Sequence, residues 1–170
     1  EEKESPFRDA KEFSTLLNAC GRLDKASIGI GACLGDKRTK EKAMQSLRGY
    51  KRMIINALNW YRDNKDTGCV EAEEGYTIIN AQDNIKASMI GTLASILSKG
   101  NDIEQGTFIL GLADLLDGHY KVSLRFCGRG QVDLKETISN ITEKVGGEAG
   151  GHQFAAGARV KEEDVDKFIA

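Results

Sequence analysis

Apolar residues recur at helical spacing through the first third of the chain. After Ser5 they follow one another at intervals of three or four residues, which predicts a helix that is capped by Ser5 and ends at Gly21. A second, short helix is predicted over residues 25–34. The longest helix is predicted over residues 39–64, with Thr39 as its N-cap.

Beyond residue 66 the pattern changes to short runs that alternate apolar and polar residues, as strands do. Asp117-Gly118 between two such runs predicts a hairpin. Helices are predicted over residues 85–98, capped by Asn84, and over residues 134–145. The expected strands cover residues 69–73, 76–80, 107–116, 119–126 and 156–160, and a helical turn covers residues 164–169. The predicted fold class is α/β, with a mixed sheet of about five strands flanked by helices and preceded by a helical segment.

Composition narrows the class of protein. The chain has 170 residues, 40% of them hydrophobic and 29% charged, which is typical of one soluble globular domain with an appended helical segment. The net charge of −2 excludes a general polycation, so any nucleic-acid binding has to use a local patch. No apolar run approaches the ~18 residues of a membrane span and no signal peptide is visible, so we expect a cytoplasmic protein.

The four cysteines are scattered along the chain. Cys20, Cys33, Cys69 and Cys127 form no C-x-x-C pair and have no histidine nearby. They are therefore predicted to be buried free thiols in a reducing compartment, and a zinc site is not expected.

A basic run lies in the longest predicted helix. Between Lys37 and Arg52 the chain carries seven basic residues and a single acidic one, Glu41. Such a run is usually a solvated helix face, and it is also the kind of surface that tracks phosphates. Composition does not decide between these interpretations.

Residues 146–157 form a glycine-rich segment, predicted to be a loop between a helix and a strand. Five of its residues are glycine and three are alanine, and it holds His152, one of two histidines in the chain. Uncovered backbone amides next to His152 and Gln153 are groups that grip a phosphate or a base edge. A tight turn without a ligand is the alternative.

Ser123 and Arg125 alternate with apolar Val122 and Leu124, so their side chains are predicted to share one face of a strand. A hydroxyl and a guanidinium fork suit a terminal phosphate, although such a pair is also common on solvent-facing strands. His119 directly follows the hairpin turn and is predicted to be a turn residue, not a ligand.

Three motifs together resemble the DHHA1 domain of the DHH phosphoesterase superfamily. Residues 150–157, Gly-Gly-His-Gln-Phe-Ala-Ala-Gly, are similar to its G-G-H-x-x-A-A-G motif, and residues 121–125, Lys-Val-Ser-Leu-Arg, to its S-x-R strand. Residues 18–23, Asn-Ala-Cys-Gly-Arg-Leu, resemble the N-A-x-G-R motif that precedes DHHA1 in RecJ-like single-strand nucleases, most of all the archaeal ones.

The resemblance implies a substrate-binding role and assigns residues to it. Ser123 and Arg125 would hold a terminal phosphate, and His152 would help to position the scissile phosphate without being catalytic itself. The residues implicated in substrate binding are Asn18, Arg22, Ser123, Arg125, Gly150, Gly151 and His152. Residues 1–66 would be a helical connector and residues 67–170 the DHHA1 domain.

The catalytic half of such a nuclease is absent from the sequence. In the family a DHH domain binds divalent Mn or Mg and activates water, and this chain contains no Asp-His-His. We therefore expect no cofactor here and an inactive chain, whose partners are single-stranded DNA or RNA, the DHH domain of the same parent, and replication or repair proteins. The alternatives are a DHHA1 module of a nanoRNA or cyclic-dinucleotide phosphodiesterase and a non-catalytic interaction domain of a replication complex.

Overall fold

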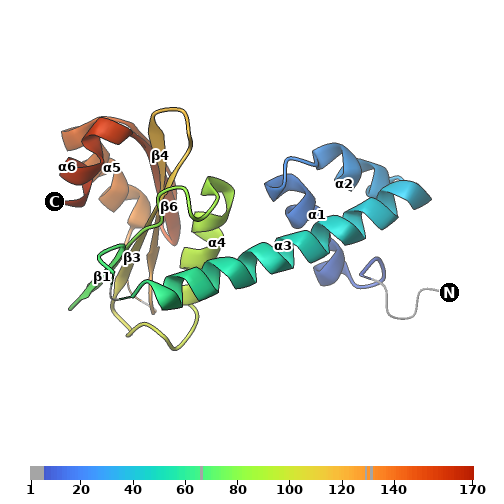
Figure 1. Ribbon diagram of the computed structural model, residues 1–170, viewed down its shortest axis with the longest axis horizontal. Helices are drawn as coiled ribbons and strands as arrows, with labels where there is room; N and C mark the ends of the chain where they lie inside the picture. Colours follow the sequence, from blue (N-terminus) through green and yellow to red (C-terminus); the bar gives the residue numbers. More distant parts are fainter. Residues whose placement is uncertain (1–5, 66, 129, 131) are drawn as a thin grey trace. The chain divides into compact units, whose positions relative to one another are not determined.

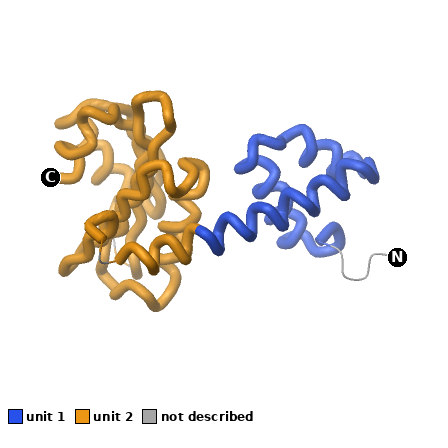
Figure 2. Tube along the Cα trace, viewed as in Figure 1, with its two compact units in different colours: residues 1–56 blue, residues 57–170 orange. Residues whose placement is uncertain are grey.

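The computed structural model describes residues 6–65, 67–128, 130 and 132–170. The chain divides into two compact units, residues 1–56 and 57–170, each of which is described by itself (Figure 2).

Three helices make up the first unit: α1 (Ala10–Arg22), α2 (Ala26–Cys33) and α3 (Lys37–Asp63), the last of which continues into the second unit. This confirms the expected order of helices. Leu16, Ala19 and Cys20 give α1 a buried face, and an added Cβ at Gly29 of α2 would lie 3.4 Å from the Cβ of Cys20. The absence of a side chain at Gly29 thus lets the two helices approach closely.

The predicted helix starts were wrong in detail. Ser5 lies outside the described residues, and α1 begins only after Asp9, whose carboxylate accepts a hydrogen bond from the Glu12 amide (2.8 Å). Asp36 takes the role expected of Thr39, because its carboxylate accepts from the Thr39 amide (2.7 Å). In both cases a carboxylate binds the unpaired amides of the first turn and is favoured there by the helix dipole.

The second unit is built on a six-stranded mixed sheet of order β1-β2-β3-β4-β6-β5 (Figure 1). Its strands are β1 (Val70–Glu73), β2 (Tyr76–Asn80), β3 (Phe108–Asp114), β4 (His119–Phe126), β5 (Glu148–His152) and β6 (Ala155–Lys161). Only β2 and β3 pair in parallel, and α4 (Ala87–Leu97) makes the crossover between them. Figure 1 shows α4 on one face of the sheet and α5 (Leu134–Val145) and α6 (Val165–Ile169) on the other.

The two faces of β4 bury different kinds of side chain. Val122 and Leu124 join a core with Ile138 of α5 and Phe168 of α6. Ser123, between them, faces α4 instead, as the alternation of a strand requires. The α/β class expected from the sequence is therefore confirmed. Ser123 and Arg125 form a polar strip of β4 that lies under α4.

The glycine-rich segment contains the sixth strand, which the sequence did not predict. Residues expected to form a loop are strand β5, which pairs antiparallel with β6. All five residues of β5 are exposed, and none is β-branched, so neither alternation nor strand propensity marks the segment.

Three smaller expectations also differ. Asn84 does not cap α4, which begins at Ala87, and its side-chain amide donates to the Ala81 carbonyl (3.3 Å) in the preceding turn. The apolar spacing of the helix predicted over residues 85–98 places Ile96 on its inward face, and the residue is 36% exposed. Cys33 was expected to be a buried thiol and is exposed at the end of α2, whereas Cys20 and Cys127 are buried.

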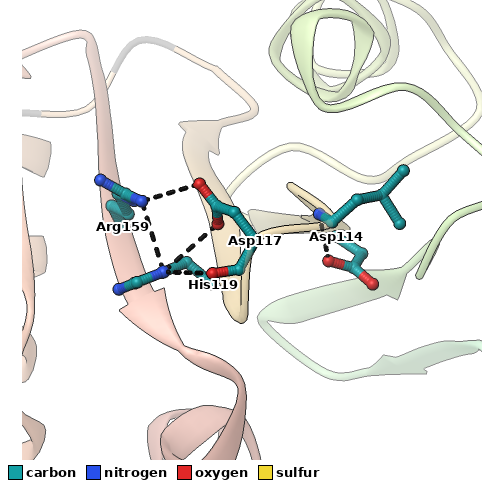
Figure 3. A network of polar contacts seen from close by, with 5 residues as sticks. Asp114, Asp117, His119 and Arg159 are labelled. Atoms are coloured by element: carbon teal, nitrogen blue, oxygen red, sulfur yellow. Dashed lines mark hydrogen bonds and ion pairs between the residues drawn. The ribbon is translucent and has the colours of Figure 1, made fainter.

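The β3–β4 hairpin is present, with a longer loop than the two residues expected. β3 ends at Asp114, whose carboxylate accepts from the Leu116 amide (2.6 Å). His119 lies beside the turn, as expected, with Nδ1 3.2 Å from Asp117 Oδ1, and Arg159 of β6 donates to Asp117 Oδ2 (2.8 Å) (Figure 3). These exposed contacts fasten the hairpin to β6 and contribute little stability individually.

Candidate functional site

Two of the residues implicated by the sequence line one pocket. Arg125, near the end of β4, and His152, the last residue of β5, are among the residues around a cavity of about 660 Å³. The other walls come from the C-terminal end of α4, the segment after β4, the start of α5 and the β5–β6 turn. The sheet thus brings together residues that are distant in sequence.

A glycine in α4 makes room for the polar strip of β4. A Cβ built on Gly91 would lie 3.2 Å from Ser123 Oγ and 3.5 Å from Arg125 Nη2. Ser123 is only 4% exposed, lies against Gly91 of α4 and does not line the pocket. A Cβ at position 91 would therefore press on the Ser123 hydroxyl and lie in van der Waals contact with the guanidinium.

The guanidinium of Arg125 is fixed by hydrogen bonds. Its Nε donates to Ser95 Oγ (2.8 Å), and Ser95 in turn donates to the Gly91 carbonyl (2.7 Å). Its Nη1 donates to the Leu124 and Ala156 carbonyls (2.7 and 3.2 Å). A half-buried guanidinium held on several sides loses little conformational entropy when it binds an anion.

His152 presents a donor toward solvent. The Phe154 amide donates to His152 Nδ1 (3.2 Å), so in the neutral ring the proton resides on Nε2. His152 is exposed, and the ring of Phe154, itself 66% exposed, meets it edge-on at a centroid distance of 6.2 Å. The β5–β6 turn therefore offers an N–H donor and an aromatic face side by side.

Glycines permit the close backbone packing behind His152. Gly151 has φ of 137°, and a Cβ there would lie 2.5 Å from the Ala155 carbonyl oxygen. Gly157 would place a Cβ 2.6 Å from the Val122 carbonyl oxygen. Gly150 has no heavy atom within 4 Å of its Cβ position. Of these three glycines, Gly151 and Gly157 are thus required by geometry and Gly150 is not.

The charged side chains among the described residues of the pocket lining are all basic. Lys99 and Arg125 are permanent cations, His152 adds a donor, and no carboxylate occurs among the described residues that line the cavity. This local charge contrasts with the net charge of −2 of the whole chain. Lys99, Ser95, Gly91 and Phe154 were not identified from the sequence as site residues, because Lys99, Ser95 and Gly91 reach the site only through the packing of α4 on β4.

Asn18 and Arg22 belong to the first unit. Asn18 is exposed on α1, and Arg22 is half-buried in its last turn, where a cation is favoured by the helix dipole. The basic side chains at Lys37, Arg48 and Arg52 of α3 are exposed. This exposure is compatible with both interpretations of the basic run.

No group of three or more His, Cys, Asp or Glu side chains that could hold a metal ion occurs among the described residues. The chain's own described residues therefore do not fit the Mn or Mg site of the DHH superfamily. In the same part of the chain, no helix is both long and apolar enough to cross a membrane.

The chain belongs to the DHHA1 domain family, whose sequence model matches residues 74–170. An uncharacterized protein of Methanocaldococcus jannaschii, MJ0831, is 30% identical over 98% of this chain, and the chain spans 35% of that protein's length.

The fold is also similar to that of solved RecJ structures. RecJ of Thermus thermophilus in complex with Mn²⁺ superposes with a TM-score of 0.68 at 18% identity, over 93% of this chain and 22% of RecJ. An exonuclease RecJ bound to manganese gives a TM-score of 0.65 at 18% identity, over 93% of this chain and 38% of the other. At this identity the likeness concerns the fold.

Proposed function

We propose that this chain is the substrate-binding portion of a RecJ-like exonuclease acting on single-stranded DNA or RNA. Residues 67–170 would form the binding domain, and residues 1–66 a connector in which Asn18 and Arg22 line the path of the strand. The observation that carries the proposal is the pocket around Arg125, where two permanent cations and a histidine converge and no described residue of the lining is acidic.

The pocket suits a phosphate group at the end of a strand. The guanidinium of Arg125 and the ammonium of Lys99 would neutralise it, and His152 Nε2–H would donate to one of its oxygens. By the family resemblance the backbone amides of Gly150 and Gly151 would add donors, although neither residue lines the pocket. Phosphate contacts would provide most of the affinity, because aromatic residues make up only 6% of the chain.

Hydrolysis is assigned to a domain outside this chain. The DHH domain of the same parent would hold the Mn²⁺ or Mg²⁺ that supplies an activated water. The residues described here would bind and orient the strand, and the isolated chain is expected to show no nuclease activity. Replication or repair proteins remain candidate partners through the family resemblance.

Fluorescence anisotropy tests the proposal with a labelled single strand of about 12 nucleotides, with and without a 5′-phosphate. We expect weak binding that is stronger with the phosphate. Arg125→Lys keeps the charge and removes the fork, so it should weaken phosphate-dependent binding by about tenfold. Lys144→Ala, an exposed lysine of α5 away from the pocket, is the control for loss of a surface cation.

Salt dependence measures how many phosphate contacts are lost. For Lys99→Ala, the slope of log K against log salt should decrease by about 0.7, the value for one contact to a single strand. An affinity for the oligonucleotide that changes neither with the 5′-phosphate nor with either substitution would refute the proposal. Dinucleotides that compete as well as the longer strand would favour a dinucleotide phosphodiesterase instead.

A further inference from the structure

A second pocket of the sheet domain has the opposite character. It has a volume of about 570 Å³ and lies among the end of α3, strands β1 and β2, and the segment before β3. Three of its hydroxyl-bearing residues are at least nine-tenths buried: Tyr61 is 3% exposed, Thr77 4% and Thr107 7%. We name it the acidic pocket, for the carboxylates described below.

These hydroxyls have no protein partner in the described part of the chain. None of the side-chain hydrogen bonds found there involves the hydroxyl of Tyr61, Thr77 or Thr107, although each residue lines the cavity. None of the three hydroxyl oxygens is among the described buried atoms that lack a hydrogen-bond partner, so each one is open to the cavity and to the water in it. Three hydroxyls open to one cavity can each exchange a hydrogen bond with water for one with a polar ligand.

The carboxylates of the acidic pocket indicate that such a ligand would carry a positive charge. Glu73, Glu74, Asp102 and Glu104 line it, against a single described cation, Lys65. The Lys65 ammonium lies over the Tyr61 ring, 5.1 Å from its centroid, so the site already attracts one cation. A directly coordinated metal is not indicated, since the described residues contain no group of ligands that could hold one. A cation that carries N–H donors fits carboxylates and hydroxyls together.

The pocket borders the free edge of the sheet. Within the described part of the chain, β1 is the terminal strand of the sheet and pairs with β2 alone. The Asn80 amide donates to the Cys69 carbonyl (2.8 Å). By the alternation of an antiparallel pair, the backbone N–H and C=O groups of Glu71 and Glu73 therefore also face β2. Val70 and Ala72 therefore direct their backbone groups outward, and both residues line the pocket. An extended segment can pair with such an edge.

We propose that the β1 edge and the acidic pocket together bind an extended basic segment of a protein partner. The segment would pair with the backbone of Val70 and Ala72 and place an arginine or lysine side chain in the acidic pocket. Its guanidinium or ammonium would donate to the hydroxyls of Tyr61, Thr77 and Thr107 and lie among the carboxylates. This interface is separate from the Arg125 pocket and does not depend on the proposed nuclease function.

The test uses a short fluorescein-labelled peptide, Lys-Val-Thr-Arg-Val-Thr-Lys, and the full chain. Its matched control replaces arginine by citrulline, which keeps the shape and removes the charge. We expect the arginine peptide to bind about tenfold more tightly, because charge-assisted hydrogen bonds are lost with citrulline. Equal affinity for the two peptides would overturn the proposal. The proposal would also be overturned if free spermidine displaced the labelled peptide at the same concentration as unlabelled peptide does. The ligand would then be a free polyamine.

Protein variants locate the binding. Asp102→Asn and Glu104→Gln should each weaken the arginine peptide by about threefold to tenfold, and Glu143→Gln, an exposed carboxylate of α5, should not. Ala72→Pro removes an outward amide, which an edge strand tolerates, and should weaken both peptides equally. Circular dichroism confirms that each variant is folded. Unchanged affinity in Asp102→Asn, Glu104→Gln and Ala72→Pro would contradict the assignment even if the peptide binds elsewhere.

Discussion

The two pockets of the sheet domain carry charges of opposite sign. The Arg125 pocket is lined by Lys99, Arg125 and His152, and the acidic pocket by four carboxylates and Lys65, counting the described residues of each. The chain as a whole has a net charge of only −2. A nearly neutral protein can thus present two selective electrostatic surfaces, because the local arrangement of charge decides which partner is attracted.

The pockets also differ in how their polar groups are satisfied. In the Arg125 pocket, Ser95 and two backbone carbonyls already hold the guanidinium, so the site is organised before a ligand arrives. In the acidic pocket the hydroxyls of Tyr61, Thr77 and Thr107 have no described hydrogen-bond partner. The first arrangement lowers the entropy cost of binding an anion, and in the second the hydroxyls exchange water for a ligand.

The largest expected effect comes from the backbone behind His152. Gly151→Ala would place a Cβ 2.5 Å from the Ala155 carbonyl oxygen at φ of 137°, so the β5–β6 hairpin has to shift. We expect the free energy of unfolding, measured with urea, to fall by about 2 kcal/mol or more. Oligonucleotide binding at the Arg125 pocket should weaken, while peptide binding at the acidic pocket should persist.

Gly150→Ala is the matched control, since no heavy atom lies within 4 Å of its Cβ position. Its free energy of unfolding should change by no more than about 0.5 kcal/mol. Equal effects of the two substitutions would contradict the close approach that the structure shows at Gly151.

A smaller effect distinguishes the Arg125 pocket, whose guanidinium is hydrogen-bonded within the protein, from the acidic pocket, whose hydroxyls have no described partner. Ser95→Ala removes the acceptor of Arg125 Nε and should lower the free energy of unfolding by about 1 kcal/mol, since the guanidinium keeps other partners and some water. Tyr61→Phe removes a hydroxyl with no described partner and should change it by less than about 0.5 kcal/mol. Urea unfolding of both variants checks this difference. A loss at Tyr61 as large as that at Ser95 would mean that its hydroxyl is satisfied within the protein.

The sequence predicts those parts of the fold that local pattern determines. The order of the helices and of five strands, the helix over residues 134–145 and the shared face of Ser123 and Arg125 all follow from spacing and residue type. The helix starts at Asp9 and Asp36 were missed because several polar residues there compete as caps. Local pattern therefore identifies elements more reliably than it identifies their ends.

Tertiary packing determines what the sequence did not predict. β5 lacks hydrophobic alternation and is a strand only because β6 pairs with it. Lys99 reaches the Arg125 pocket because Gly91 allows α4 to lie close to β4. Tyr61 lies in the helix predicted over residues 39–64, and nothing local indicates that its hydroxyl opens on a polar cavity. Both pockets are products of sheet order and not of any single motif.

The smallest effect concerns the ionisation of Tyr61. Burial raises the pKa of its phenol above the usual value of 10.0, and the negative charges of Asp102 and Cys127 raise it further. The folded state therefore holds the phenolic proton more strongly than the unfolded chain does. The corresponding stability is fully present below the usual pKa and is lost as the pH rises through the folded pKa. Tyr61→Phe should accordingly make the free energy of unfolding decline less steeply above about pH 10.

A bound guanidinium changes this titration in a defined direction. Arginine stays charged at alkaline pH, and a positive charge beside the phenol favours the phenolate, so the arginine peptide should lower the pKa of Tyr61 relative to the free protein. Phenolate absorbance followed against pH measures the shift, and the Tyr61→Phe variant gives the contribution of the other tyrosines to subtract. The citrulline peptide should leave the titration unchanged. A shift of equal size with both peptides would show that the arginine does not reach the acidic pocket, and that binding at the β1 edge alone alters the surroundings of Tyr61.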